Sequence, residues 1–165
     1  MPSRRKVIAA ITFAILTICA VPAALGAVTT EGSLAEYKET VEPICSANAQ
    51  KNEKILSGVR TDVREGNLKH AAVQFGKAAT ALQSTFRELN AVPQPSANAT
   101  RLTKWLTYVK TEVALLRKVA AELRKGQANR ARAVAAKLTH NANLANSQIA
   151  IFDLRSCIFK PTQYV

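Results

Sequence analysis

The sequence predicts an all-α fold: an up-down-up-down antiparallel four-helix bundle made of two αα-hairpins and preceded by a cleavable N-terminal signal helix. Three observations predict this fold. After residue 27, apolar residues recur at spacings of three, four and seven, and strand-type alternation is missing. A glycine turn recurs after 60 residues, and two cysteines lie near the two ends of this region. Heptad apolar positions in consecutive helices are typical of antiparallel bundle packing.

The first 26 residues have the order of a secretory signal peptide. Basic residues at 4–6 precede an uncharged apolar run over 7–25, and Ala24 and Gly26 place small residues at a cleavage site. We therefore expect a protein that is secreted or exposed in the cell envelope, with its signal peptide at 1–26.

Two other interpretations of this leader stay open. The run 7–28 is about long enough to span a bilayer as a helix, so the leader could remain as a membrane anchor. Pro22, near the end of the run, favours cleavage instead. A lipoprotein would carry its lipid on Cys19, but Ile18 stands before it, where such a site needs a small residue.

The first helix of the bundle is expected to carry an apolar face over 34–63 and to end at Gly66. Pro43 lies within this stretch. Either the helix kinks there, or a short leading turn ends and the main helix starts with Pro43 in its first turn.

The second and third helices share one pattern, in which every seventh residue is apolar. The two series are Leu68, Phe75, Leu82 and Leu89, then Leu102, Val109, Leu116 and Leu123. A loop with Pro93 and Pro95 separates these helices. The fourth helix, from about Gln127 to Phe152, has a core face rich in alanine.

A repeat of 60 residues organises these helices into hairpins. Residues 63–68 align with 123–128, and each segment contains a glycine, Gly66 or Gly126, between two helical patterns. Short glycine turns force neighbouring helices to be antiparallel. The resulting domains are an acidic N-terminal lead-in at 27–42, the four-helix bundle at 43–158 and a C-terminal tail at 159–165.

Cys45 and Cys157 are the two cysteines that remain once the leader is removed. An even pair of thiols in an exported protein predicts a disulfide, whereas two free thiols would need a reducing compartment. In the predicted topology, Cys45 near the start of the first helix meets Cys157 just past the end of the fourth. Loop-entropy estimates for a closed loop of about 110 residues give about 4–5 kcal/mol.

The charge is strongly positive, with 23 Lys and Arg against 11 Asp and Glu. This balance suits contact with anionic lipid head groups or anionic envelope polymer, although a merely solvated face is the alternative. Nucleic acid is disfavoured, because export removes the protein from it and few aromatic residues are present for base stacking. We expect one positive face made by Lys104, Lys110, Arg117, Lys118, Arg124, Lys125, Arg130 and Arg132.

Asparagines near core positions of the first and fourth helices form a second polar signal. If the disulfide sets the register, Asn52 lies near Asn146, and their amides are expected to bond and to fix that register. A polar pocket for a small ligand is the other interpretation.

Catalytic and metal-binding motifs are missing from the sequence. His70 and His140 have no second ligand at the spacing of a metal site, and the cysteines are best used by the disulfide. We expect no metal, no cofactor and no enzyme activity. His140 alone could ligate a non-covalent haem between helices, but a polar histidine on the helix surface is favoured.

These features predict a non-catalytic protein with a binding or scaffolding role. One alternative is an electrostatic binder of an anionic membrane or wall surface. Another is a carrier of a small ligand or haem in the bundle interior. The sequence names no partner and leaves the oligomeric state open.

The chain resembles small exported four-helix proteins of actinobacteria. The resemblance rests on the leader, on Tyr37 and Ile44-Cys45, on the paired glycine turns with their alanine-rich helices, and on the terminal segment 152–157. It implies an extracytoplasmic helical bundle with a terminal disulfide. It carries over no functional residues, because the shared motifs are structural.

Overall fold

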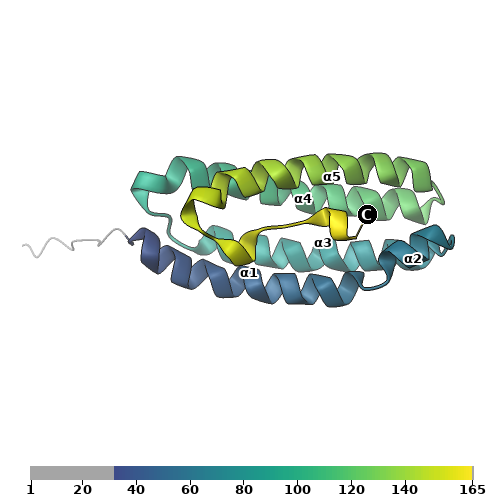
Figure 1. Cartoon of the computed structure of the whole chain (residues 1–165), viewed down its shortest axis with the longest axis horizontal. Coiled ribbons are helices and arrows are strands. Elements are labelled where there is room, and N and C mark those ends of the chain that lie inside the picture. Colours follow the sequence, from purple (N-terminus) through teal and green to yellow (C-terminus); the bar gives the residue numbers. More distant parts are fainter. Residues whose placement is uncertain (1–31, 165) are drawn as a thin grey trace, which may run out of the picture.

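A computed structural model describes residues 32–164, and the expected signal peptide lies outside this range. The described chain is all-helical, and its long helices run antiparallel to their chain neighbours, up, down, up and down (Figure 1). The long helices are α1 (Leu34–Leu56), α3 (Leu68–Ala91), α4 (Ala99–Arg124) and α5 (Ala128–Ile149). A short helix, α2 (Val59–Arg64), follows α1. The 3₁₀ turns are Ser96–Asn98, Ala150–Phe152, Arg155–Cys157 and Pro161–Gln163.

Helix α1 begins well before Pro43. Ser33 caps it: its Oγ accepts from the Glu36 N–H at 3.2 Å, and the Glu36 carboxylate accepts from the Ser33 N–H at 2.7 Å. This capping box satisfies two N–H groups that a helix start leaves without partners. Tyr37 and Val41 then bury their side chains in the core. The described part of the expected acidic lead-in is therefore the start of the first helix, and Pro43 lies inside that helix.

The first helix also ends earlier than its apolar pattern indicates. Gly58 has φ 76°, a left-handed conformation that interrupts the helix after Leu56. The freed Ser57 carbonyl accepts from the Gln74 side chain of α3 at 2.9 Å. Val59 is buried again at the start of α2, so the apolar spacing continues across the break and conceals it in the sequence.

The two hairpin turns have the same backbone geometry. Gly66 and Gly126 both have positive φ, 82° and 75°. In the first turn, Gly66 N–H donates to Val63 O and the next N–H donates to Asp62 O; in the second, the residues 60 positions later make the same two bonds. Both are Schellman motifs, which need glycine at the left-handed position. The predicted repeat of glycine turns is confirmed.

The core extends along the whole bundle. The seven-residue series of α4 is fully buried, as is that of α3 from Phe75 onward, and Leu68 is only partly buried at its start. Burying a side chain of this size stabilises a protein by about 1.5–3 kcal/mol. Alanines on α3 and α5, such as Ala71 and Ala131, are also buried, so the helices pack closely.

The last part of the chain fills the gap between α1 and α5. After the 3₁₀ turn that follows α5, Asp153 adopts a left-handed conformation with φ 55°, and the chain runs back between these helices (Figure 1). We call residues 150–164 the returning segment. Helix α1 makes its main contacts with α3 and with the turn Arg155–Cys157, not with α5. The expected direct pairing of the first and fourth helices is therefore wrong, and the tail is part of the fold, with Pro161 buried.

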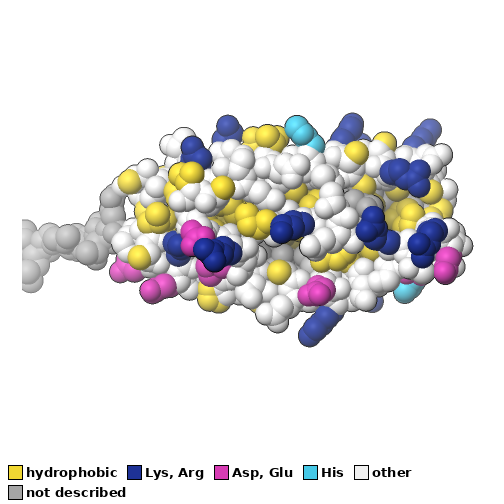
Figure 2. Space-filling view, in the orientation of Figure 1, with side chains coloured by type: hydrophobic (Ala, Val, Ile, Leu, Met, Phe, Trp, Pro, Cys, Tyr) yellow, Lys and Arg dark blue, Asp and Glu magenta, His cyan; other side chains and the backbone are white. Residues whose placement is uncertain are grey.

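Lys and Arg side chains are scattered over the face of the bundle shown in Figure 2, and Asp and Glu are fewer on it. Along one end of this face, an apolar hollow lies between basic side chains. Over the described residues, no helix combines the length and the apolar character that a membrane span requires.

Candidate functional site: a polar cavity under the returning segment

Cys45 and Cys157 lie at disulfide distance, with Sγ atoms 2.05 Å and Cα atoms 4.9 Å apart. This confirms the predicted pair. Its place in the fold differs from the prediction, because Cys45 lies in the middle of α1 and Cys157 belongs to the returning segment. The bond therefore attaches this segment to α1, and it does not join the end of α5 to the start of α1.

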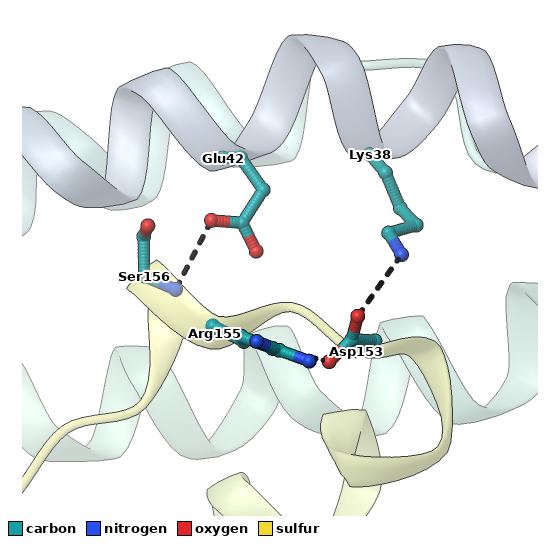
Figure 3. A network of polar contacts seen from close by, with 5 residues as sticks. All are labelled: Lys38, Glu42, Asp153, Arg155 and Ser156. Carbon is teal, nitrogen blue, oxygen red and sulfur yellow. Dashed lines mark hydrogen bonds and ion pairs between the residues drawn. The ribbon is translucent and has the colours of Figure 1, made fainter.

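Polar contacts attach the same segment to the first half of α1 (Figure 3). The Glu42 carboxylate accepts from the Ser156 N–H at 3.0 Å, and Lys38 lies 3.9 Å from Asp153. Arg155 binds the other oxygen of Asp153 at 2.7 Å. The Arg155 hydrogen bond and charge, with a smaller contribution from Lys38, hold the pKa of Asp153 below its usual value. Charged side chains of α1 thus hold the segment at two points, Lys38 at Asp153 and Glu42 at Ser156.

Asn146 holds the segment from the side of α5. Its Nδ2 donates to the Phe159 carbonyl at 2.9 Å, and its Oδ1 accepts from the Phe159 N–H at 3.1 Å. The predicted bond between Asn146 and Asn52 is not formed. Asn52 donates instead to Asn48 on its own helix at 3.2 Å. The register argument failed because the returning segment lies between the two helices.

A cavity of about 470 Å³ lies beneath the returning segment. Its walls come from α1, α3, α4 and the segment itself, so all four parts of the chain must fold before it exists. Apolar wall residues include Leu82, Leu89, Trp105 and Val109. We call it the Glu112 cavity, because Glu112 of α4 is its one acidic lining residue.

Glu112 is a carboxyl group in the core. Its exposed fraction is 2%. Burial raises its pKa from 4.5 to about 8, and a hydrogen bond from the Asn141 side chain opposes this rise. Among the residues that the structure describes, its Oε1 atom finds no hydrogen-bond partner. Near pH 7 the side chain is therefore mostly protonated and neutral when the cavity is empty.

Asn52 is a second residue of this lining with an unpartnered buried oxygen. Its exposed fraction is 3%, and its Oδ1 atom is buried without a partner. Thr85, also in the wall, uses its hydroxyl hydrogen on the Ala81 carbonyl. The remaining charged or titratable lining residues, Arg155, Lys160 and Tyr164, all belong to the returning segment. The cavity thus combines apolar walls with two lining residues whose buried oxygens have no hydrogen-bond partner within residues 32–164.

Sequence reasoning identified Asn52 and the cysteines but missed Glu112 and Trp105. A signal for them exists. Trp105, Glu112 and Val119 lie seven residues apart, next to the Leu102 series. A carboxylate in a series of buried positions marks a group that the core must accommodate at a cost. The apolar residues on either side concealed it, because the leucine series alone already predicted the helix.

The eight basic residues of the predicted positive face are all exposed, but they do not make one face. Arg130 and Arg132 lie two positions apart on α5, and such residues point away from each other on a helix. Arg132 lies beside α2 in the apolar hollow, whereas Arg124 lies near the start of α3. Arg117 of α4 donates to Gln83 of α3 at 3.4 Å.

His140 is exposed on α5 and is not among the residues of the Glu112 cavity. The cavity walls hold no histidine, and the two cysteines there are joined to each other. His140 therefore does not face the Glu112 cavity. Within residues 32–164, no group of three or more His, Cys, Asp or Glu side chains is placed to hold a metal ion.

Comparisons with protein-family models, with curated proteins and with solved structures give no match for this chain. The functional assignment therefore rests on the site itself.

Proposed function

We propose that the protein is an exported, non-catalytic binding protein that holds a small hydrogen-bond-donating molecule in the Glu112 cavity. The observation that carries this proposal is a pair of buried oxygens, Glu112 Oε1 and Asn52 Oδ1, which have no hydrogen-bond partner within residues 32–164 and belong to two residues that line one cavity. Each buried donor or acceptor left without a partner costs about 1–3 kcal/mol. A hydroxyl or an amine that donates to Asn52 Oδ1 and accepts from the protonated Glu112 carboxyl offsets this cost, which gives the site its preference.

Size and wall chemistry define the ligand further. A cavity of about 470 Å³ lies within the usual range for small-molecule sites. Most of its wall is apolar, and Trp105 supplies an aromatic ring. The matching ligand has a compact apolar body and one donor group, a hydroxyl or an amine. An ammonium group would bind more tightly, because it would also interact with the face of the Trp105 ring and with an ionised Glu112.

Export is part of the proposal. The leader has the order of a signal peptide, and the chain resembles exported helical bundles. The Cys45–Cys157 pair is compatible with an oxidising location outside the cytoplasm. The lack of catalytic motifs in the sequence supports a binding role over an enzymatic one.

The test uses three probes with the same body: cyclohexylamine, cyclohexanol and methylcyclohexane. Each is titrated into the oxidised protein while NMR shifts of the Trp105 indole are followed. We expect the amine and the alcohol to bind and the hydrocarbon to bind at least tenfold more weakly. Equal binding of all three, or no binding at all, would contradict the proposal.

Two variants locate the binding. Glu112→Gln keeps the shape of the side chain but cannot ionise, so it should weaken binding of the amine about tenfold and that of the alcohol much less. Ala49→Trp places a large ring at the wall of the cavity on an exposed position of α1. It should block both probes while leaving Glu112 in place. Unchanged binding in both variants would place the probes elsewhere.

A further inference from the structure

A second hollow lies on the outside of the bundle, near the turns that join α2 to α3 and α4 to α5. It has a volume of about 380 Å³. Its lining includes three arginines from two helices, Arg60 and Arg64 of α2 and Arg132 of α5, and all three are exposed. Figure 2 shows this hollow as an apolar patch with Lys and Arg side chains around it. We call it the arginine hollow.

The floor of the arginine hollow is apolar. Phe75, Val119 and Leu123 reach it from α3 and α4, and Ala128 and Ala131 come from the first turns of α5. Small alanine side chains on α5 leave the space that a larger residue would fill. The helix break at Gly58 matters here, because it lets α2 carry its arginines in a helix separate from α1.

Within residues 32–164, the three guanidinium groups have no acidic partner. No Asp or Glu lines the hollow, and none of the three forms an ion pair within residues 32–164. Arg64 reaches only the Thr61 hydroxyl, at 3.5 Å, and Arg132 only the Asn129 side chain, at 3.4 Å. The carboxylate of Asp62, next along α2, is occupied by His70 at 2.8 Å.

We infer that the arginine hollow binds a free single-chain amphiphile with an anionic head group, a carboxylate or a phosphate. Guanidinium groups match the geometry of both head groups and form paired hydrogen bonds with them. The apolar floor accepts the first part of the chain, and each buried methylene contributes about 0.8 kcal/mol. Neither the charges nor the floor alone would select this class, but together they require both a negative head and an apolar chain.

The experiment measures binding of dodecyl phosphate to the oxidised protein by isothermal titration calorimetry, below the concentration at which the probe forms micelles. Inorganic phosphate and dodecyltrimethylammonium are the comparators. We expect dodecyl phosphate to bind at least tenfold more tightly than either, and its affinity to fall as salt is added. Equal affinity for inorganic phosphate would show an anion site without a chain site and would overturn the inference.

Matched variants test the location. Arg60→Gln, Arg64→Gln and Arg132→Gln together should weaken binding at least tenfold. Lys104→Gln, Lys110→Gln and Lys118→Gln remove the same charge from exposed positions of α4 and should have little effect. Equal losses in the two triple variants would show general attraction by the basic surface and would overturn the inference.

Ala128→Trp tests the floor without changing the charge. Ala128 is half-buried, and a large ring there should occupy the hollow and weaken dodecyl phosphate binding. Unchanged affinity in this variant would exclude the floor as the chain site. Binding to vesicles with anionic lipid, without binding of the monomeric probe, would assign the arginines to a membrane surface instead. Glu112→Gln should leave this binding unchanged, so failure here is separate from failure of the Glu112 cavity.

Discussion

Glu112 is an ionisable residue at a buried position of the core. It occupies a heptad position of α4 where the neighbouring members of the series, Trp105 and Val119, are buried and apolar. The fold keeps it by protonation, since burial raises its pKa to about 8, and by a hydrogen bond from Asn141. Such a group lowers stability when it ionises, and here it belongs to the lining of the Glu112 cavity.

The stability of the protein should therefore depend on pH through Glu112. Its pKa is higher in the folded chain, about 8, than the usual 4.5, so the folded state holds the proton more tightly. Its favourable contribution is complete below about pH 4.5, declines as pH rises, and is lost above about pH 8. Glu112→Gln does not titrate. We expect it to match the wild type near pH 4.5 and to be more stable by a few kcal/mol at pH 9.

Urea denaturation at a series of pH values, with the disulfide intact, measures this difference. Other groups titrate in both proteins, so only the difference between the two curves reports on Glu112. Parallel curves would mean that the carboxyl group is hydrated and that the Glu112 cavity is open to water. The same result would remove the basis for a neutral, protonated Glu112 near pH 7.

At the residue scale, some contacts could be predicted from the sequence and others could not. The cysteine pair was predictable, because the leader predicts export and an exported chain is expected to join an even pair of cysteines. The partner of Asn146 was not, because it is the backbone of Phe159 rather than a side chain. A main-chain partner leaves no trace in residue type, so the sequence suggested another asparagine instead.

At the scale of elements, the glycine turns are the most predictable part of the fold. A left-handed residue ends each of the two hairpin helices in the same way, and the sequence shows this as a glycine at a 60-residue interval. The start of α1 is also marked in the sequence by Ser33 and Glu36 at capping-box spacing, and of the two alternatives left open at Pro43, the structure has the one in which the helix contains Pro43. Local cap signals deserve more weight than a proline that a helix can contain.

Replacing these glycines by alanine should distinguish the effect of backbone conformation from that of side-chain packing. A Cβ atom at Gly66 or Gly126 meets no atom within 4 Å, so alanine there adds backbone strain without a clash. We expect each substitution to destabilise the protein by about 1 kcal/mol. Gly76→Ala is the control, because it also has open space but lies inside α3, where alanine should stabilise by about 0.5–1 kcal/mol.

Thermal unfolding of the three single variants gives the comparison. A fall in Tm for Gly66→Ala and Gly126→Ala, with a rise for Gly76→Ala, is the expected pattern. If all three moved in the same direction, the left-handed turns would not be what makes glycine necessary at these positions.

At the scale of the whole molecule, the returning segment determines the architecture. Four amphipathic helices with short turns predict a bundle in which the first and last helices touch. Here residues 150–164 take that place, and they supply one wall of the Glu112 cavity. Tyr164 also lines the arginine hollow. The sequence could not show this, because 3₁₀ turns and extended backbone have no periodic pattern to read.

The disulfide should therefore matter more for the returning segment than for the bundle. Reduction, or the double substitution Cys45→Ser and Cys157→Ser, opens a loop with a sequence separation of 112 residues. We expect a loss of about 2–5 kcal/mol in the free energy of unfolding, with the helical circular dichroism retained. Contacts of Glu42 with Ser156 and of Asn146 with Phe159 remain, but they must then hold the segment against its own chain entropy.

Hydrogen exchange distinguishes the two regions. In the reduced protein, the amides of Ser156 and Phe159 should exchange much faster with solvent. The exchange rates of amides in the middle of α3 and α4 should change only as far as the global stability changes. Because the segment closes the Glu112 cavity, cyclohexanol binding should weaken in parallel. Uniform acceleration across all helices would mean that the disulfide stabilises the bundle as a single unit. The returning segment would then be an integral part of the core, and the cavity beneath it could not open independently of unfolding.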